Sequence, residues 1–240
     1  ASRQARGTAI VNILQLEPGE LVTTLIPIKK FRPDHYLLMV TKNGSVKKTE
    51  LTEFDSSRRT GLVAISIRED DELIGVRLTN GEKEIIIGTK KGFAIRFDEK
   101  DVRPMGRTAM GVRGINLRKN DEVIGMDLVS DGSYLLAISI KGFGKMTSLD
   151  AYRTQTRGGK GVTTYNITEK TGELVGIRIV TTEDDIMLIN NHGIVIRLEA
   201  SGISQMGRNT QGVTLMRAGK DDEVICAAKV YVSEEKEVIV

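Results

Sequence analysis

The sequence repeats one short pattern, a basic turn that contains glycine and is followed by an apolar run. The glycines of the five copies lie 50 to 54 residues apart: Gly7, Gly61, Gly111, Gly161 and Gly212. A period of this length is typical of units that cannot bury their own sheet faces and must stack against their neighbours. The repeat therefore predicts a fold built from similar blades.

Two further patterns recur with the same spacing. One is an acid followed by an apolar run, at 20–22, 71–75, 121–125, 173–176 and 222–226. The other is a glycine-containing hairpin turn with cations on the return strand, at 42–48, 90–96, 141–145 and 191–197. Asn43-Gly44 is a strong hairpin signal. The chain ends where a fifth hairpin would follow.

Each unit reads as about four short strands. Runs rich in Ile, Leu and Val at Tyr36–Thr41, Ile85–Thr89, Tyr134–Ile140 and Ile186–Ile189 have strand character. No amphipathic helix of eleven or more residues is evident, and single helical turns are expected within 98–105, 147–152 and 199–205.

We therefore predict one all-β, propeller-like domain over residues 1–240, with about five four-stranded blades. The units run roughly over 1–54, 55–105, 106–152, 153–206 and 207–240, the last of them incomplete. An elongated β-solenoid is the competing architecture, although solenoid periods are usually shorter.

Charge is unevenly distributed in this nearly neutral chain, whose formal net charge is +3. The segment between Val102 and Asn120 holds five cations and no acid, while acids cluster at 69–72, 183–185 and 221–223. Similar blades would place their basic turns at one radius, which makes a cationic band suited to the closely spaced phosphates of duplex DNA. Aromatic residues are only 4% and Trp is absent, which disfavours single-strand binding by base stacking. No recognition helix is evident, so we expect contacts to the backbone of bent duplex.

Other chemistry finds little support in the sequence. Gly159-Lys160 is followed by Gly161 rather than Ser or Thr, which argues against a nucleotide-binding P-loop. His35 and His192 have no companion ligands at metal-binding spacing. No catalytic triad, cofactor motif or long apolar span is evident, and a single cysteine fits a reducing cytoplasm. We expect no cofactor, no metal and no membrane association.

The fourth turn, Gln155-Thr156-Arg157-Gly158-Gly159-Lys160-Gly161, resembles the "GyrA box", the Q-R-R-G-G-K-G-type signature of the C-terminal domain of the DNA gyrase A protein. Thr156 stands where that signature usually has Arg. The stretches 5–14, 43–49, 111–115 and 207–213 are also similar to that domain, so the resemblance covers nearly the whole chain. The best-known box of the family lies in its first repeat, whereas here the box is in the fourth copy.

The resemblance implies a β-pinwheel, a propeller-like ring whose blades exchange strands. It also implies wrapping of duplex DNA around a basic rim, which sets the crossing handedness for negative supercoiling. The implied partners are DNA, the rest of the gyrase A protein and the gyrase ATPase subunit, in the bacterial cytoplasm at the nucleoid. The isolated domain is expected to be a monomer that neither cleaves DNA nor hydrolyses ATP.

The expected DNA contacts are the basic and glycine residues of the turns and the cations of the hairpins. They are Arg58, Arg59, Arg107, Arg113, Arg153, Gln155, Thr156, Arg157, Gly158, Gly159, Lys160, Gly161, Arg208, Lys47, Lys48, Lys91, Arg96 and Lys145. The hairpin cations have a second interpretation, as outward charges that discourage edge pairing. Two other functions stay open: a topoisomerase IV C-terminal domain, and a propeller-like scaffold for acidic protein partners.

Overall fold

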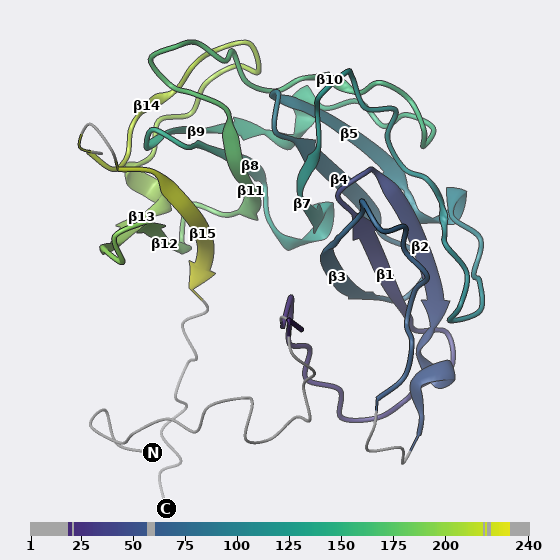
Figure 1. Ribbon diagram of the computed structural model, residues 1–240. Coiled ribbons are helices and arrows are strands. Elements are labelled where there is room, and N and C mark those ends of the chain that lie inside the picture. Colours follow the sequence, from purple (N-terminus) through teal and green to yellow (C-terminus); the bar gives the residue numbers. More distant parts are fainter. Residues whose placement is uncertain (1–18, 21, 57–60, 218, 220–221, 231–240) are drawn as a thin grey trace, which may run out of the picture.

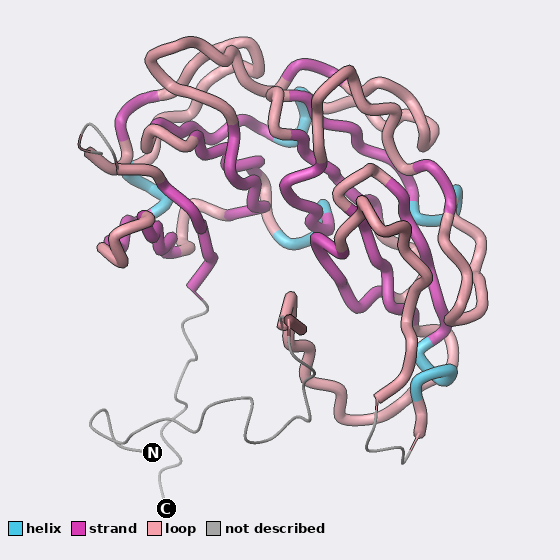
Figure 2. Tube along the Cα trace, viewed as in Figure 1, coloured by secondary structure: helices cyan, strands magenta, loops and turns pink. Residues whose placement is uncertain are grey.

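Four antiparallel sheets follow one another around an open arc (Figure 1). The structure is a computed structural model and describes residues 19–20, 22–56, 61–217, 219 and 222–230. Strands and loops make up nearly all of this part of the chain (Figure 2). The only helices in these ranges are single 3-10 turns, which confirms the all-β prediction.

Each sheet contains one β-hairpin, which forms the middle of the three four-stranded sheets. The four hairpins are β1 (Tyr36–Thr41) with β2 (Ser45–Glu50), β4 (Glu84–Thr89) with β5 (Phe93–Asp98), β8 (Tyr134–Ser139) with β9 (Phe143–Ser148), and β12 (Asp185–Asn190) with β13 (Val195–Glu199). All four lie where the glycine-containing turns predict them.

One strand closes the inner edge of each sheet. These inner strands are β3 (Leu73–Thr79), β7 (Val123–Leu128), β11 (Leu174–Val180) and β15 (Val224–Val230). Each pairs antiparallel with the first strand of its hairpin. Consecutive inner strands lie beside one another around the centre of the arc (Figure 1).

The outer edge of a sheet is completed by a strand from further along the chain. The short strands β6 (Val112–Arg113), β10 (Val162–Thr163) and β14 (Val213–Thr214) pair with β2, β5 and β9. The unit 106–152 therefore contributes β6 to the first sheet, β7 to the second, and β8 and β9 to the third. This exchange of strands is the β-pinwheel arrangement.

Several details differ from the sequence-based expectations. The described residues form four sheets rather than about five, and the fourth sheet has three strands there. The apolar run that follows the second basic turn, at 62–67, is a loop, and the strands after the later turns are only two residues long. The first turn, at Arg6-Gly7, lies outside the described residues. The limits of the five units remain a prediction.

The single helical turns lie close to where they were expected. They are η3 (Glu99–Asp101), η5 (Leu149–Ala151) and η6 (Ala200–Gly202), each directly after the second hairpin strand, and η2 (Leu51–Phe54) takes the same place in the first sheet. A further turn, η4 (Val129–Asp131), follows β7.

The core lies between the faces of neighbouring sheets. Leu38 of the first sheet packs with Ile85 and Phe97 of the second, and Leu136 of the third packs with Ile186 and Leu188 of the fourth. All of these side chains are fully buried. Because both faces of an interior blade are covered, its strands β4 and β8 are buried at nearly every position rather than at alternate positions.

Replacing Gly212 with alanine is expected to lower the free energy of unfolding by at least about 2 kcal/mol, since a left-handed backbone strains an L residue. Gly212 has φ of +73°, and an added Cβ would lie 2.5 Å from the carbonyl oxygen of Gly144. Gly207→Ala in the same turn is the matched control, because its Cβ meets nothing within 4 Å. Urea denaturation followed by circular dichroism measures both variants. Equal losses of stability would contradict the analysis.

Candidate nucleic-acid interface

Three equivalent turns line the outer edge of the described sheets, at 107–111, 157–161 and 208–212. The last glycine of each turn has a positive φ, and its Cα lies against a strand of the sheet. A Cβ on Gly111 or Gly161 would lie 2.6 or 2.5 Å from the carbonyl oxygens of Val46 and Ala94. Glycine is therefore needed where the turn meets the strand.

The arginine that opens each turn donates to a carbonyl that follows the turn glycine of the preceding repeat. Arg107 Nη1 donates to the Val63 carbonyl at 3.4 Å, and Arg157 Nη1 donates to the Arg113 carbonyl at 3.0 Å. Arg208 makes the equivalent bond to Thr163, at 3.2 Å. Each acceptor lies two residues after a turn glycine, so the same contact recurs from turn to turn.

Backbone hydrogen bonds reinforce the same junctions. Asn116 N donates to the Gly159 carbonyl at 2.8 Å, and Asn166 N donates to the Thr210 carbonyl at 3.0 Å. The Gly158 amide donates to the Gly114 carbonyl at 2.6 Å. The turns therefore form one connected row along the outer edge of the arc.

Two buried lysines support this row from beneath. Lys47 Nζ donates to the carbonyl of Ala64 at 2.7 Å and to that of Arg107. Lys145 Nζ donates to the carbonyls of Gly207 and Arg208, at 2.5 and 2.6 Å. Both side chains are 0% exposed. Desolvation, together with the adjacent arginine of the turn, lowers the pKa of each lysine to about 8.

Two more hairpin cations bind within the protein. Lys48, 4% exposed, donates to the Glu99 carbonyl at 2.9 Å and faces the Glu99 carboxylate, and burial lowers its pKa. Arg96 pairs with Glu84, whose pKa is lowered chiefly by that hydrogen bond, and donates to the Leu149 carbonyl at 3.0 Å.

The structure does not support the predicted DNA contacts of Lys47, Lys48 and Lys145. Their ammonium groups are buried against backbone carbonyls. Arg96 is also committed to internal acceptors. The alternative interpretation, that the hairpin cations point outward from the strands, does not fit these buried lysines. It does fit Arg197 of the fourth hairpin, which is exposed and pairs with Asp185.

The cations that remain accessible lie on the turns of the first two sheets. Lys160, Arg113 and Arg153 are exposed, and Arg157 is partly exposed while its Nε donates to the Asp101 carbonyl at 2.8 Å. Lys91 donates to the Lys119 carbonyl at 2.8 Å. The exposed or half-buried backbone of Thr156, Gly158, Gly159 and Gly161 completes the fourth turn, and Gln155 N donates to the Arg96 carbonyl at 2.8 Å. Arg58 and Arg59 lie outside the described residues.

Two cations belong with this group although the sequence-based set omits them. Arg103 is exposed and precedes Arg107 by four residues, just as Arg153 precedes Arg157. Arg118 Nη1 donates to the Lys160 carbonyl at 2.8 Å and stacks over the Phe93 ring. The shared spacing from the turn arginine is the signal that identifies Arg103.

The third described turn is much less charged. In the repeat of turn 208–212, Ser204 and Gln211 stand where the repeat of turn 157–161 has Arg153 and Lys160. Thr214 stands where the repeat of turn 107–111 has Arg113. Among the three described turns, the exposed cations therefore lie at the first two, 107–111 and 157–161.

Four segments of the chain match one protein family. The family described as "DNA gyrase C-terminal domain, beta-propeller" matches residues 35–80, 83–130, 133–181 and 184–229. Each matched segment begins at a hairpin and ends near the inner strand of the same sheet. The chain belongs to the DNA gyrase C-terminal domain family.

Relatives of this gyrase domain are DNA gyrase A proteins. The chain is 57% identical over 230 residues to the gyrase A protein of Clostridium acetobutylicum, 53% over 234 residues to that of Halalkalibacterium halodurans, and 46% over 239 residues to that of Staphylococcus aureus. These alignments cover 96%, 98% and 98% of the chain but only 28%, 28% and 27% of the relatives. The chain therefore spans little more than a quarter of their length.

Solved structures agree with this fold. A topoisomerase IV C-terminal domain superposes with a TM-score of 0.88 at 29% identity, covering 93% of this chain and 70% of that one. A DNA gyrase A C-terminal domain superposes with a TM-score of 0.85 at 26% identity, covering 95% and 76%. The two folds are nearly equally similar, so the gyrase assignment rests on the family matches and the gyrase A relatives.

Over the described ranges, no group of three His, Cys, Asp or Glu side chains is arranged to hold a metal ion. No helix in the same ranges is long and apolar enough to cross a bilayer.

We expect Lys145→Met to change how stability depends on pH. The pKa of Lys145 is about 8 in the fold, below its ordinary value of 10.5, so between these values the unfolded chain binds more protons. The free energy of unfolding of the wild type should therefore rise with pH from about 8 towards 10.5, relative to the variant. Urea titrations at several pH values measure the difference. Lys141→Met, which removes an exposed lysine of the same hairpin, is the control.

A stability difference between Lys145→Met and the wild type that stays constant over this pH range would contradict the burial of a charged ammonium at Lys145. The same slope in Lys141→Met would show that the effect is not specific to the site.

Proposed function

We propose that this gyrase domain binds duplex DNA along its outer row of turns and bends it around the arc. The single observation that carries the proposal is the row itself, in which accessible cations stand on turns fixed to one another by repeated hydrogen bonds. A fixed row of charges faces a polyanion without the loss of conformational freedom that flexible loops would incur.

The contacts expected from this surface are to the phosphate backbone. Lys160, Arg113, Arg153 and Arg103 are exposed side chains with several donors each, and the glycines of the fourth turn allow close approach of its backbone. The described residues include no helix that could enter a major groove. Sequence preference would then come from the ease of bending rather than from base contacts.

Arg157 has a positioning role in this proposal. Its Nε and Nη1 bind the carbonyls of Asp101 and Arg113, so the guanidinium holds the fourth turn against the preceding one. Only its remaining donors can face DNA. Removing Arg157 would disturb the turn as well as remove a charge, which makes Lys160 and Arg113 the better probes of direct contact.

In the context of the whole gyrase A protein, bending along this row would guide a duplex segment around the domain and set the handedness of the crossing used for negative supercoiling. The proposed partners are duplex DNA, the remainder of the gyrase A protein and the gyrase ATPase subunit, in the bacterial cytoplasm at the nucleoid. We propose that the domain has no catalytic activity of its own and acts as a monomer.

The double variant Arg113→Ala/Lys160→Ala is expected to weaken duplex binding and reduce bending while leaving the fold intact, because both side chains are exposed. Losing two phosphate contacts should make the slope of log K against log salt less steep by up to about 1.8. Fluorescence anisotropy over a salt series measures affinity, and end-to-end energy transfer on a duplex of about 150 base pairs measures bending.

Lys29→Ala/Lys30→Ala is the matched control, because it removes the same charge from exposed positions in the segment before β1. Figure 1 shows that segment below the sheets, far from β10. Equal effects of the two double variants would refute a specific interface. Absence of duplex bending by the unaltered chain, with tight binding of an acidic protein, would favour the scaffold function.

A further inference from the structure

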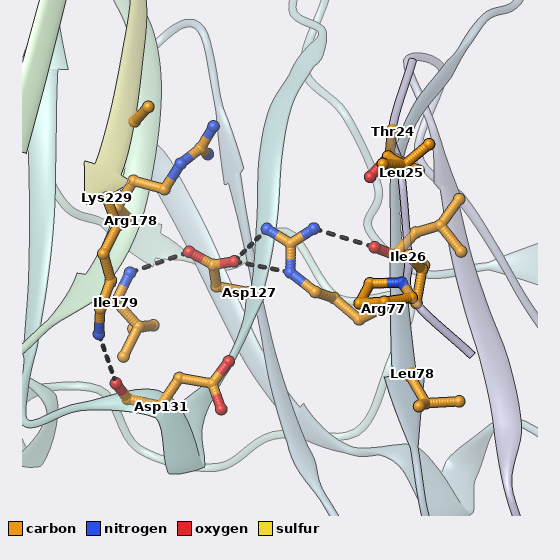
Figure 3. A pocket seen from close by; sticks show the side chains of 13 residues that line it. Thr24, Leu25, Ile26, Arg77, Leu78, Asp127, Asp131, Arg178, Ile179 and Lys229 are labelled. Atoms are coloured by element: carbon orange, nitrogen blue, oxygen red, sulfur yellow. Dashed lines mark hydrogen bonds and ion pairs between the residues drawn. The ribbon is translucent and has the colours of Figure 1, made fainter. Parts of the chain in front are cut away.

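The inner strands carry a second set of equivalent positions. The fifth residue of each strand is Arg77 in β3, Asp127 in β7, Arg178 in β11 and Ala228 in β15. These four residues, and the segment 24–27, line a cavity of about 460 Å³ at the centre of the arc (Figure 3). This volume is in the range of small-molecule sites.

The first two positions form a complete ion pair. Arg77 Nε donates to Asp127 Oδ1 at 2.9 Å, and Nη2 donates to the same oxygen. Arg77 Nη1 donates to the carbonyl of Val76, the residue before it, at 2.9 Å. The other carboxylate oxygen of Asp127 accepts the Ile179 amide at 2.9 Å. Figure 3 shows the carboxylate held from both sides.

Arg178 repeats half of this arrangement. Its Nη1 donates to the carbonyl of the preceding residue, Ile177, at 2.7 Å, as Arg77 does to Val76. On the next strand, however, the position of Asp127 is taken by Ala228. Nε and Nη2 of Arg178 have no protein acceptor among the described residues, and the guanidinium lies at the cavity (Figure 3).

Most of the other charged groups around Arg178 are already paired, and the Asp131 carboxylate, which accepts Ser130 Oγ at 3.2 Å, also lines the cavity. Lys229 pairs with Asp184 at 2.7 Å and donates to the Asp131 carbonyl at 3.2 Å, so its charge is matched. Asp127 is matched by Arg77. Among the described residues, Arg178 is therefore the cation of this wall that has no carboxylate partner. The apolar side chains of Leu25, Ile26 and Ile179 line the same cavity.

We propose that this axial cavity binds a small molecule with one carboxylate and a short apolar portion. The carboxylate takes the place beside Arg178 that Asp127 takes beside Arg77, and the apolar portion lies against Leu25, Ile26 and Ile179. A guanidinium favours a carboxylate because its planar fork offers two parallel donors. The site is independent of DNA binding, since the inner strands and the short outer strands lie at opposite edges of the first three sheets.

The test uses the chain labelled with ¹⁵N and titrated with hexanoate, followed by amide chemical shifts. Saturable shifts are expected at Ile177, Ile179 and Ala228. Arg178→Gln should weaken binding by at least about tenfold, as expected for losing a charge-assisted hydrogen bond. Hexanol, which has the same chain without the carboxylate, should not saturate the site.

Ala228→Asp is the sharper variant, because it supplies an internal carboxylate at the position equivalent to Asp127. It should abolish hexanoate binding, raise Tm by about 2–4 °C and leave duplex affinity unchanged. The proposal is overturned if hexanoate fails to saturate, or if the two variants, shown to be folded by their amide spectra, bind it as the wild type does. Tighter binding of inorganic phosphate than of hexanoate would overturn the carboxylate class.

Discussion

The first three sheets each depend on a two-residue strand that their own hairpin unit does not supply. β6, β10 and β14 return to the sheet formed one hairpin earlier, where a glycine with positive φ lets the turn lie directly against the edge strand. A pair of ladder residues adds little stability by itself. The turn is held because the arginine, the inter-turn amide bonds and, in two of the three sheets, a buried lysine act on the same few residues. The outer row is therefore as fixed as the sheets it joins.

Lysines have two different roles along the outer row, one buried and structural, the other exposed. Lys47 and Lys145 lose their hydration to bind turn carbonyls, which lowers the pKa of each lysine to about 8, while Lys160 keeps its ammonium in water. Beneath the turn 157–161, β5 has Ile95 at the position where β2 and β9 have a buried lysine, and a Cβ on Gly159 would lie 3.5 Å from Ile95. The turn that carries the GyrA-box residues therefore packs on an apolar side chain, and its cation Lys160 is exposed.

The hairpins, the inner strands and the helical turns could be predicted because each has a local cause, such as Asn43-Gly44 or the apolar run after Asp121. The inward direction of Lys47 and Lys145 could not. Both strands, β2 and β9, are buried at consecutive positions, so the alternation that normally separates inward from outward residues is absent. The exchange of strands between sheets could not be predicted either. The repeat length gives the spacing of the strands along the sequence, but it does not say which hairpin each strand pairs with. The role of Arg157 in holding its turn became visible only with its acceptors, and whether the box contacts DNA stays a prediction.

Neighbouring sheets are joined by hydrogen bonds at both the outer and the inner edge of the arc. At the outer radius, Arg157 and Arg208 tie each turn to the one before it. At the inner radius, Asp127 binds Arg77 on one side and the Ile179 amide on the other, which joins three inner strands. At the junction of the third and fourth sheets, Ala228 has no side-chain acceptor for Arg178. Packing of Val180, Ile186 and Ala227 and the bond from Lys229 Nζ to the Asp131 carbonyl hold this junction instead. A carboxylate bound at Arg178 would supply the acceptor that the Arg77–Asp127 pattern lacks at this junction.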